Sequence, residues 1–313
     1  MIKGLPELSE GYEIAFVRYF LQDAAEASLL PSEEGAACAV VQPPLCGTQA
    51  GAWVWLVSEF DTMERKGNRT MVMSNGVRHL WTGGTCFPLE DSGKEGLETI
   101  LEYEGILGEY GMDMEKDCVR TWFFVKDIDN NYKDFVVSRR ERFSELGMTA
   151  DTHYIASTGI CGEPVVKGAT VLLDTYAISG EASKQYLYAP DFLNRTSEYG
   201  VTFERGVTVS YDTDQWISIS GTASIDNKGQ ILHEGDVAAQ CIRMLTNVEA
   251  LLAEAGSSLK DIPALIVYLR NREDAQLVHS LISSRFPNKE FIILEAPVCR
   301  PGWLIEMECS FSL

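Results

Sequence analysis

The sequence predicts an α+β protein built from two similar halves, each a β-sheet with two helices on one face. Two observations lead to this prediction. Segments of helix length carry apolar residues at steps of three and four, and runs of β-branched and aromatic residues typical of strands lie between them. The same order of segments then occurs twice along the 313 residues, with Gly111 in the first half corresponding to Gly256 in the second.

The second half shows the repeating unit most clearly. A helix is predicted over 236–256, because its apolar side chains fall on one face and a glycine closes it. The members of that apolar face are Val237, Cys241, Leu245, Val248 and Leu252. An apolar strand follows at 262–270, and helical spacing returns at 273–286. The unit is therefore interpreted as helix, strand and helix.

The first half repeats this order. A helix is predicted over 97–111, a strand over 118–125 and a second helix over 132–146. Each half also has one strand before the unit and a strand pair after it. These outer strands are placed at 80–85, 153–158 and 169–176 in the first half, and at 217–225, 291–295 and 303–311 in the second.

The boundary between the halves is expected near residue 180, because 178–185 is polar and prone to turns. This divides the chain into domains 1–180 and 181–313. A sheet with helices on only one face must protect its other face, which in such domains usually means packing against another copy. We therefore expect a closed oligomer.

The composition narrows the classes of function. Asp and Glu number 46 against 26 Lys and Arg, and the resulting net charge of −20 argues against binding to nucleic acid or to an anionic membrane surface. No apolar run approaches the length of a membrane-spanning helix, and the first residues do not resemble a secretion signal. We therefore expect a cytoplasmic protein.

No cofactor or metal is expected. The eight cysteines include no CxxC pair and are interpreted as free thiols, and the four histidines are too far apart for a common zinc-binding motif. Glycine-rich loops of the dinucleotide-binding and P-loop types do not occur. Zinc, dinucleotide and P-loop chemistry therefore lack their usual sequence support.

Several segments of the second half resemble the RidA (YjgF/YER057c/UK114) family. They lie at 220–223, 235–236, 255–261 and 304–308. Further segments, at 120–128, 156–160 and 298–306, resemble the chorismatases, which are chorismate-cleaving enzymes built from two RidA-like halves. The resemblance implies a chorismate mutase-like fold with a mixed sheet in each half. It also implies a homotrimer, or pseudo-hexamer of halves, with clefts between its subunits.

Glu306 is the candidate catalytic acid. Alternation along 303–311 places Glu306 and Glu308 on one face of a strand, where two carboxylates between apolar neighbours can raise one pKa. A carboxyl group that stays protonated at neutral pH can protonate carbon. The resemblance implies that the acceptor is the methylene carbon of the enolpyruvyl ether of chorismate. The alternative is that Glu306 is an exposed strand residue or one partner of an interface salt bridge.

Cys299 is the second catalytic candidate, because it lies seven residues before Glu306, across a turn that contains Arg300. The resemblance associates a cysteine at this spacing with chorismatases that form hydroxybenzoates. The alternative is a packed thiol. Arg300 is interpreted either as a residue that binds substrate or as a corner residue facing solvent.

Further candidates are expected to bind substrate. Arg195 lies in a segment that resembles a chorismatase Pro-x-Phe-x-Arg pattern with one extra residue, and a guanidinium suits a carboxylate. Tyr199 and Arg205 follow nearby and are placed either at the border of the cleft or in an interface or surface role.

Three residues of the second half are expected to approach a ligand through their backbone, and they are Gly221, Thr222 and Ala223. Gly221 is equally suited to a turn. A basic cluster on the second helix of the first half is interpreted as a solvated helix face, and its members are Arg139, Arg140 and Arg142.

The expected function is cleavage of the enolpyruvyl ether of chorismate, a small anionic carboxylate, to release pyruvate and a hydroxybenzoate or a dihydroxycyclohexadiene carboxylate. The second half would carry the site, because alignment of the repeats places Leu172 opposite Glu306 and Asp174 opposite Glu308. One alternative is a RidA-type enamine or imine deaminase, although Phe291 and its neighbours stand where such enzymes hold a carboxylate-binding arginine. The other is a non-catalytic trimer that binds a small metabolite.

Overall fold

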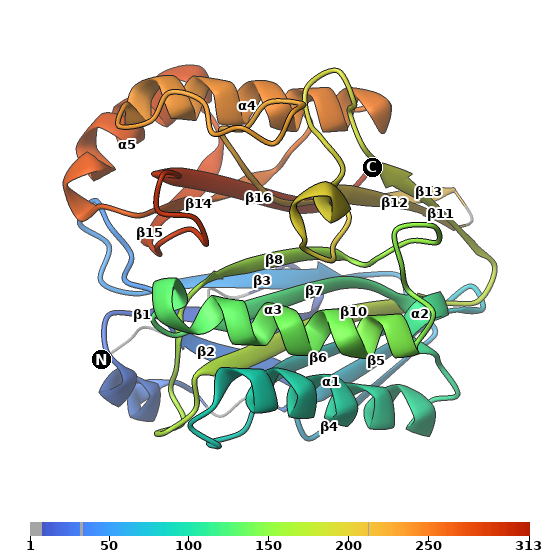
Figure 1. Cartoon of the computed structure of the whole chain (residues 1–313). Coiled ribbons are helices and arrows are strands. Elements are labelled where there is room, and N and C mark those ends of the chain that lie inside the picture. The colour runs from blue at the N-terminus through green and yellow to red at the C-terminus, as the bar shows by residue number, and fades with distance from the viewer. Residues whose placement is uncertain (1–7, 32–33, 212) are drawn as a thin grey trace.

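The computed structural model describes residues 8–31, 34–211 and 213–313, and it contains three β-sheets (Figure 1). Two of the sheets have six strands and each carries its own helices. In the view of Figure 1, α4 and α5 lie above the strands of one sheet, and α1 and α3 lie in front of the strands of the other. The protein is therefore of the predicted α+β class.

The first half forms a mixed sheet in the order β4-β5-β6-β10-β7-β8, in which β7 and β8 are parallel and the other neighbours are antiparallel. Its strands are β4 (Thr62–Lys66), β5 (Arg69–Ser74), β6 (Val77–Cys86), β7 (Cys118–Val125), β8 (Ala156–Cys161) and β10 (Val171–Ser179). Its helices are α1 (Ser92–Glu109), α2 (Met114–Asp117) and α3 (Ile128–Glu145). The predicted strand pair after the second helix is not adjacent, because β7 lies between β8 and β10.

The second half repeats this topology in the order β11-β12-β13-β16-β14-β15, so the last strand of each half lies between its third and fourth. Its strands are β11 (Ala182–Leu187), β12 (Gly206–Tyr211), β13 (Asp214–Ala223), β14 (Ala264–Leu269), β15 (Glu290–Glu295) and β16 (Ile305–Ser312). Its helices are α4 (Val237–Glu254) and α5 (Ala275–Arg285), with the short 3-10 helices η2 (Thr196–Tyr199) and η3 (Arg272–Asp274).

The ends of the long helices follow from local sequence. Asp236 begins α4, and its side chain accepts a hydrogen bond from the backbone N–H of Ala239 at 3.0 Å. After α4 the chain turns at Gly256 with a φ of +74°, a conformation that glycine adopts without strain. In α1, Asp91 plays the corresponding role and accepts from the N–H of Lys94.

The third sheet was not foreseen from the sequence. It has the order β3-β1-β2-β9, with β1 (Glu13–Leu21), β2 (Ala36–Val41), β3 (Gly51–Val57) and β9 (Glu163–Pro164), and the 3-10 helix η1 (Ala24–Leu29) joins β1 to β2. Its first three strands are apolar runs of strand length that lie before the repeated unit. Because they have no counterpart in the second half, a search for repeats passes over them.

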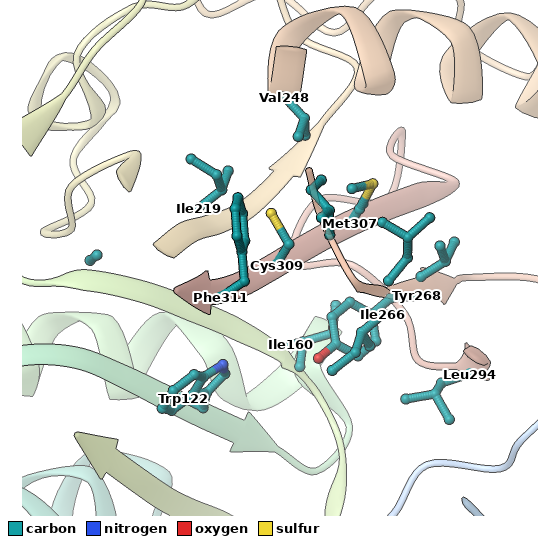
Figure 2. Close-up of a cluster of buried hydrophobic side chains, with 14 of the residues drawn as sticks. Trp122, Ile160, Ile219, Val248, Ile266, Tyr268, Leu294, Met307, Cys309 and Phe311 are labelled. Carbon is teal, nitrogen blue, oxygen red and sulfur yellow. The ribbon is translucent and has the colours of Figure 1, made fainter. Parts of the chain in front are cut away.

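One cluster of buried apolar side chains crosses both halves, and it includes residues on the helix-facing side of β16 as well as residues between the sheets. Figure 2 shows Trp122 and Ile160 of the first half in the same cluster as Ile219, Met307 and Phe311 of the second. The N-terminal sheet joins the same core through residues of β1 and β2. The sheet faces that we expected another copy to cover are therefore covered within one chain, and the homotrimer remains a prediction.

Two further observations concern the described residues. None of their helices combines the length and the apolar character that a membrane crossing requires. Within 8–31, 34–211 and 213–313, no group of three or more His, Cys, Asp or Glu side chains is arranged to hold a metal ion.

Candidate functional site

Glu306 lies on the central strand β16 and faces the first half of the chain. Its backbone is in register with Ala223 on β13 and with Tyr268 on β14. The side chain is only 5% exposed, and no described residue donates a hydrogen bond to it. Burial raises the pKa of Glu306 to about 8, and the negative charge of Glu308 adds to this effect. Glu306 is therefore a neutral carboxylic acid at pH 7.

Glu308 shares the inner face with Glu306 but is fully bonded. Its carboxylate accepts hydrogen bonds from Arg120 Nη2 at 2.5 Å, from Trp122 Nε1 at 3.0 Å and from the hydroxyls of Thr158 and Tyr268. These partners hold a negative charge in place beside Glu306. The sequence predicted that one of the two carboxyl groups on this strand has a raised pKa. The different surroundings of Glu306 and Glu308 explain why Glu306 is that group.

The alignment of the two repeats is confirmed by strand pairing. Leu172 is in register with Phe124 in the first half, as Glu306 is with Tyr268 in the second. Leu172 is apolar and buried, so the first half has no acid at this position.

A cavity of about 170 Å³ contains the Glu306 side chain and lies between the two halves of one chain. From the first half, Tyr132 and Arg139 of α3 line it, together with Ser157 and Gly159 of β8. The lining from the second half includes Val201, Phe203, Arg205, Gly221, Ala223, Ile225, Cys299, Arg300 and Trp303. These lining residues all come from one chain, whereas the resemblance placed clefts between subunits.

The three backbone candidates lie next to Glu306 in different ways. Gly221 lies where a Cβ would overlap Glu306 Oε1 and would reach Thr158 Cγ2 at 3.1 Å. Ala223 lines the cavity. Thr222 does not, because its buried hydroxyl donates to the carbonyl of Ser220 at 2.8 Å. Gly221 is thus needed for the close approach of strand and acid, and it lies within β13 rather than in a turn.

Cys299 and Arg300 both line the cavity, as the spacing to Glu306 predicts. Burial raises the pKa of the Cys299 thiol to about 12, and the nearby Glu306 adds to the shift. Cys299 is therefore a neutral thiol. A neutral thiol is a poor nucleophile, so Cys299 contributes to the shape and polarity of the cavity wall. The guanidinium of Arg300 stacks over the Trp303 ring at 4.9 Å.

Arg139 is buried against the cavity, so its interpretation as part of a solvated helix face is wrong. Its side chain is 1% exposed and its Nε donates to Thr202 Oγ1 at 3.2 Å. Its Nη2 is buried and has no hydrogen-bond partner among the described residues. A buried donor without a partner is costly, and an anion in the cavity would satisfy it.

Helical spacing is the signal that would have found Arg139 and Tyr132. The two residues are seven positions apart on α3 and share a face with Phe135 and Phe143, both of which are buried. Arg139 lies on this apolar stripe, whereas its neighbour Arg140, about 100° further round the helix, is exposed. The presence of three arginines close together in the sequence does not by itself reveal that Arg139 is buried and Arg140 is exposed.

Arg205 also lines the cavity and is held by Asn194. Its guanidinium donates to the backbone carbonyl of Asn194 at 3.1 Å and to the side-chain oxygen of the same residue at 3.1 Å. The positive charge of Arg205 acts on Glu306 and lowers the pKa of that carboxyl, which burial nevertheless keeps high. The cavity therefore combines one neutral acid with three guanidinium groups, from Arg139, Arg205 and Arg300.

The structure does not bring Arg195 into the cavity. Its guanidinium lies over the Tyr188 ring at 4.2 Å, and its Nη2 is 3.9 Å from Glu204 Oε1. The side chain is 40% exposed. Tyr199 lies at the end of η2, and its side chain is outside the described part of the chain.

The chain is similar to proteins of two kinds. Residues 203–311 match the family model described as Endoribonuclease L-PSP. A chorismatase from Streptomyces rapamycinicus is 27% identical over 70% of this chain and 71% of its own length, and a 3-hydroxybenzoate synthase from Streptomyces hygroscopicus is 26% identical over 65% of both. A RutC family protein from Pyrococcus abyssi is 32% identical over 30% of this chain and 75% of its own length.

The likeness to a solved structure extends over nearly the whole chain. A crystal structure of a chorismatase superposes with a TM-score of 0.78 at 19% identity, and the match covers 98% of this chain and 95% of the other. The duplicated sheet topology, with a buried acid facing a cavity between the halves, defines a tandem protein of the RidA type. The chain belongs to the RidA family, and its relatives that extend over both halves include proteins named chorismatase and 3-hydroxybenzoate synthase.

Proposed function

We propose that this protein cleaves chorismate at its enolpyruvyl ether and releases pyruvate. The observation that carries the proposal is Glu306, a buried carboxyl group whose pKa is raised to about 8 and which faces a cavity with three guanidinium groups. Such a group is an acid with a proton to give at neutral pH. The similarity to chorismatases supports chorismate as the substrate.

Glu306 would protonate the methylene carbon of the enol ether, which leaves an oxocarbenium centre on the adjacent carbon. Water would add to that centre to give a hemiketal, and cleavage of its C–O bond would yield pyruvate and the hydroxyl group of the ring product. Glu306, now a carboxylate, would recover a proton from this sequence. Glu308, paired with Arg120, lies two residues from Glu306 on the same strand face, and a negative charge there would favour the developing positive charge.

Chorismate carries two carboxylates, and the cavity offers matching cations. Arg139 has an unused buried donor, while Arg205 and Arg300 lie on the opposite side of the cavity, in the second half. Guanidinium groups bind carboxylates through charge-assisted hydrogen bonds, and they do so more strongly away from water. We assign substrate binding to these three residues in place of Arg195.

Cys299 would decide which ring product forms. A neutral thiol at the wall of the cavity can limit where water or the ring hydroxyl group moves after the ether bond breaks. With Cys299 in place we expect a hydroxybenzoate, which arises when loss of water makes the ring aromatic. Without the thiol we expect a larger share of the dihydroxycyclohexadiene carboxylate.

The test is incubation of the purified protein with chorismate, with pyruvate and ring products measured by mass spectrometry. We expect pyruvate from the wild type and a loss of at least about 100-fold in Glu306→Gln, the range for removal of a general acid. Glu273→Gln, at an exposed position on η3, is the matched control and should keep full activity. A folded wild type that forms no pyruvate contradicts the proposal, and release of ammonia from an amino-acid-derived imine would then identify a deaminase.

A further inference from the structure

A second cavity, of about 910 Å³, lies where all three sheets meet. Its lining comes from β3 of the N-terminal sheet, from β5, β6 and β10 of the first half and from β13 and β16 of the second. It shares no lining residue with the Glu306 cavity. Its volume falls in the range of small-molecule sites, about 300–1,000 Å³. We refer to it as the aromatic cavity because of its walls.

The walls are aromatic rings that hold one another in place. Trp81 and Tyr176 stack with their centres 4.7 Å apart. Trp55 meets Tyr176 edge-on at 5.2 Å and Trp81 at 5.9 Å, and its centre lies 5.8 Å from that of Trp216. Trp55 is half-buried, whereas the other three rings are at most 4% exposed. Trp81, Tyr176 and Trp216 are therefore fixed by packing, and Trp55 is the one of these four rings with appreciable exposure.

The charges around the aromatic cavity are of one sign. Asp214, at the start of β13, is an exposed carboxylate in its lining, and the lining contains no Lys or Arg. No Lys or Arg of the described residues lies within 4.0 Å of Asp214. His79 is also in the lining, but burial lowers its pKa to about 4, so it is neutral at pH 7. The Glu306 cavity has the opposite character, with three arginines.

We propose that the aromatic cavity binds an organic cation, an amine or quaternary ammonium group carried on an apolar or aromatic body. The faces of Trp and Tyr rings carry partial negative charge and attract cations, and Asp214 supplies a full negative charge at the rim. An anion such as chorismate would find no positive partner there. This inference does not depend on the proposed chorismate cleavage, because the two cavities share no residue.

Tryptophan fluorescence of the full chain gives a direct test, because Trp53, Trp55, Trp81 and Trp216 all line the cavity. Three probes that share a phenyl ring on a methylene group differ in charge: benzyltrimethylammonium, benzyl alcohol and phenylacetate. We expect saturable quenching by the cation, with affinity at least about tenfold above that for the neutral alcohol, and the weakest binding for the anion.

Two variants locate the binding. Asp214→Asn should weaken binding of benzyltrimethylammonium by about two- to fivefold, as expected for an exposed charge, and leave benzyl alcohol unchanged. Trp55→Leu should weaken the cation more strongly, and circular dichroism would establish that this variant is folded. Glu306→Gln, in the other cavity, should bind the cation as the wild type does.

Several outcomes would overturn the inference. They are equal affinity for the three probes, tighter binding of phenylacetate, or cation binding that Glu306→Gln abolishes and Asp214→Asn leaves intact. Self-association in sedimentation that removes the quenching would show that another copy of the chain, and not a cation, fills the cavity.

Discussion

The carboxyl group of Glu306 occupies the space that a side chain at Gly221 would need. A Cβ on Gly221 would overlap Glu306 Oε1, and the backbone N–H of Gly221 donates to Thr158 Oγ1 at 2.9 Å. Thr158 in turn donates to Glu308. The missing side chain on β13 thus positions the acid on β16.

Gly221→Ala should therefore displace Glu306 and impair catalysis. We expect a loss of about 100-fold in kcat for pyruvate release, the effect of moving a catalytic group by about 1 Å, and a loss of about 1–3 kcal/mol in the free energy of unfolding. Gly105→Ala is the control, because nothing lies within 4 Å of a Cβ at this exposed position in α1. It should stabilise the helix by about 0.5–1 kcal/mol and keep wild-type activity.

Activity should fall as pH rises through about 8, because Glu306 then loses the proton it must donate. The free energy of unfolding should fall as pH rises between 4.5, the ordinary pKa of a glutamate side chain, and about 8, because the unfolded chain ionises at Glu306 over this range and the folded chain does not. Urea unfolding of wild type and Glu306→Gln at several pH values measures this. The variant should gain stability relative to the wild type as pH rises, and a constant difference would show that the pKa of Glu306 is not raised.

Replacement of Arg139 should weaken substrate binding. Arg139→Leu removes the buried guanidinium and should lower kcat/KM by about 10- to 100-fold, since hydrogen bonds to charged groups contribute about 1.5–3 kcal/mol. Arg139→Lys keeps the charge and should recover part of this loss. The exposed neighbour variant Arg140→Gln should have wild-type kinetics, and circular dichroism should establish that each variant is folded.

Arg195→Gln tests whether Arg195 binds the substrate, as the sequence pattern implies, or lies outside the site, as the structure indicates. Because the Arg195 guanidinium lies on Tyr188 and outside the cavity, we expect less than about a threefold change in KM. A rise in KM as large as that of Arg139→Leu would return the carboxylate-binding role to Arg195.

Activity per chain should be independent of protein concentration, because both walls of the Glu306 cavity come from one chain. Initial rates over a broad dilution series measure this, and sedimentation over the same range tests the expected homotrimer. A specific activity that falls on dilution together with the mass would show that a neighbouring subunit completes the site.

Sequence and structure agree best where the information is local. The apolar spacing of 236–256 predicted α4 and its closure at Gly256, and the short spacing between Cys299 and Glu306 predicted that both reach one cavity. Agreement is weaker where the fold decides whether a side chain reaches the cavity. The pattern around Arg195 suggested a binding residue, but the fold directs that side chain to Tyr188.

The sequence by itself determined the α+β class, the duplication and the strand that presents an acid, because these depend on periodicity and on comparison of one half with the other. Only the tertiary structure decided that the acid is neutral, that Arg139 is buried beside it and that a third sheet closes the core within one chain. The physical reason is that a pKa and the environment of a guanidinium depend on which surfaces exclude water. Those surfaces come from segments more than 100 residues apart, such as Arg120 and Glu308.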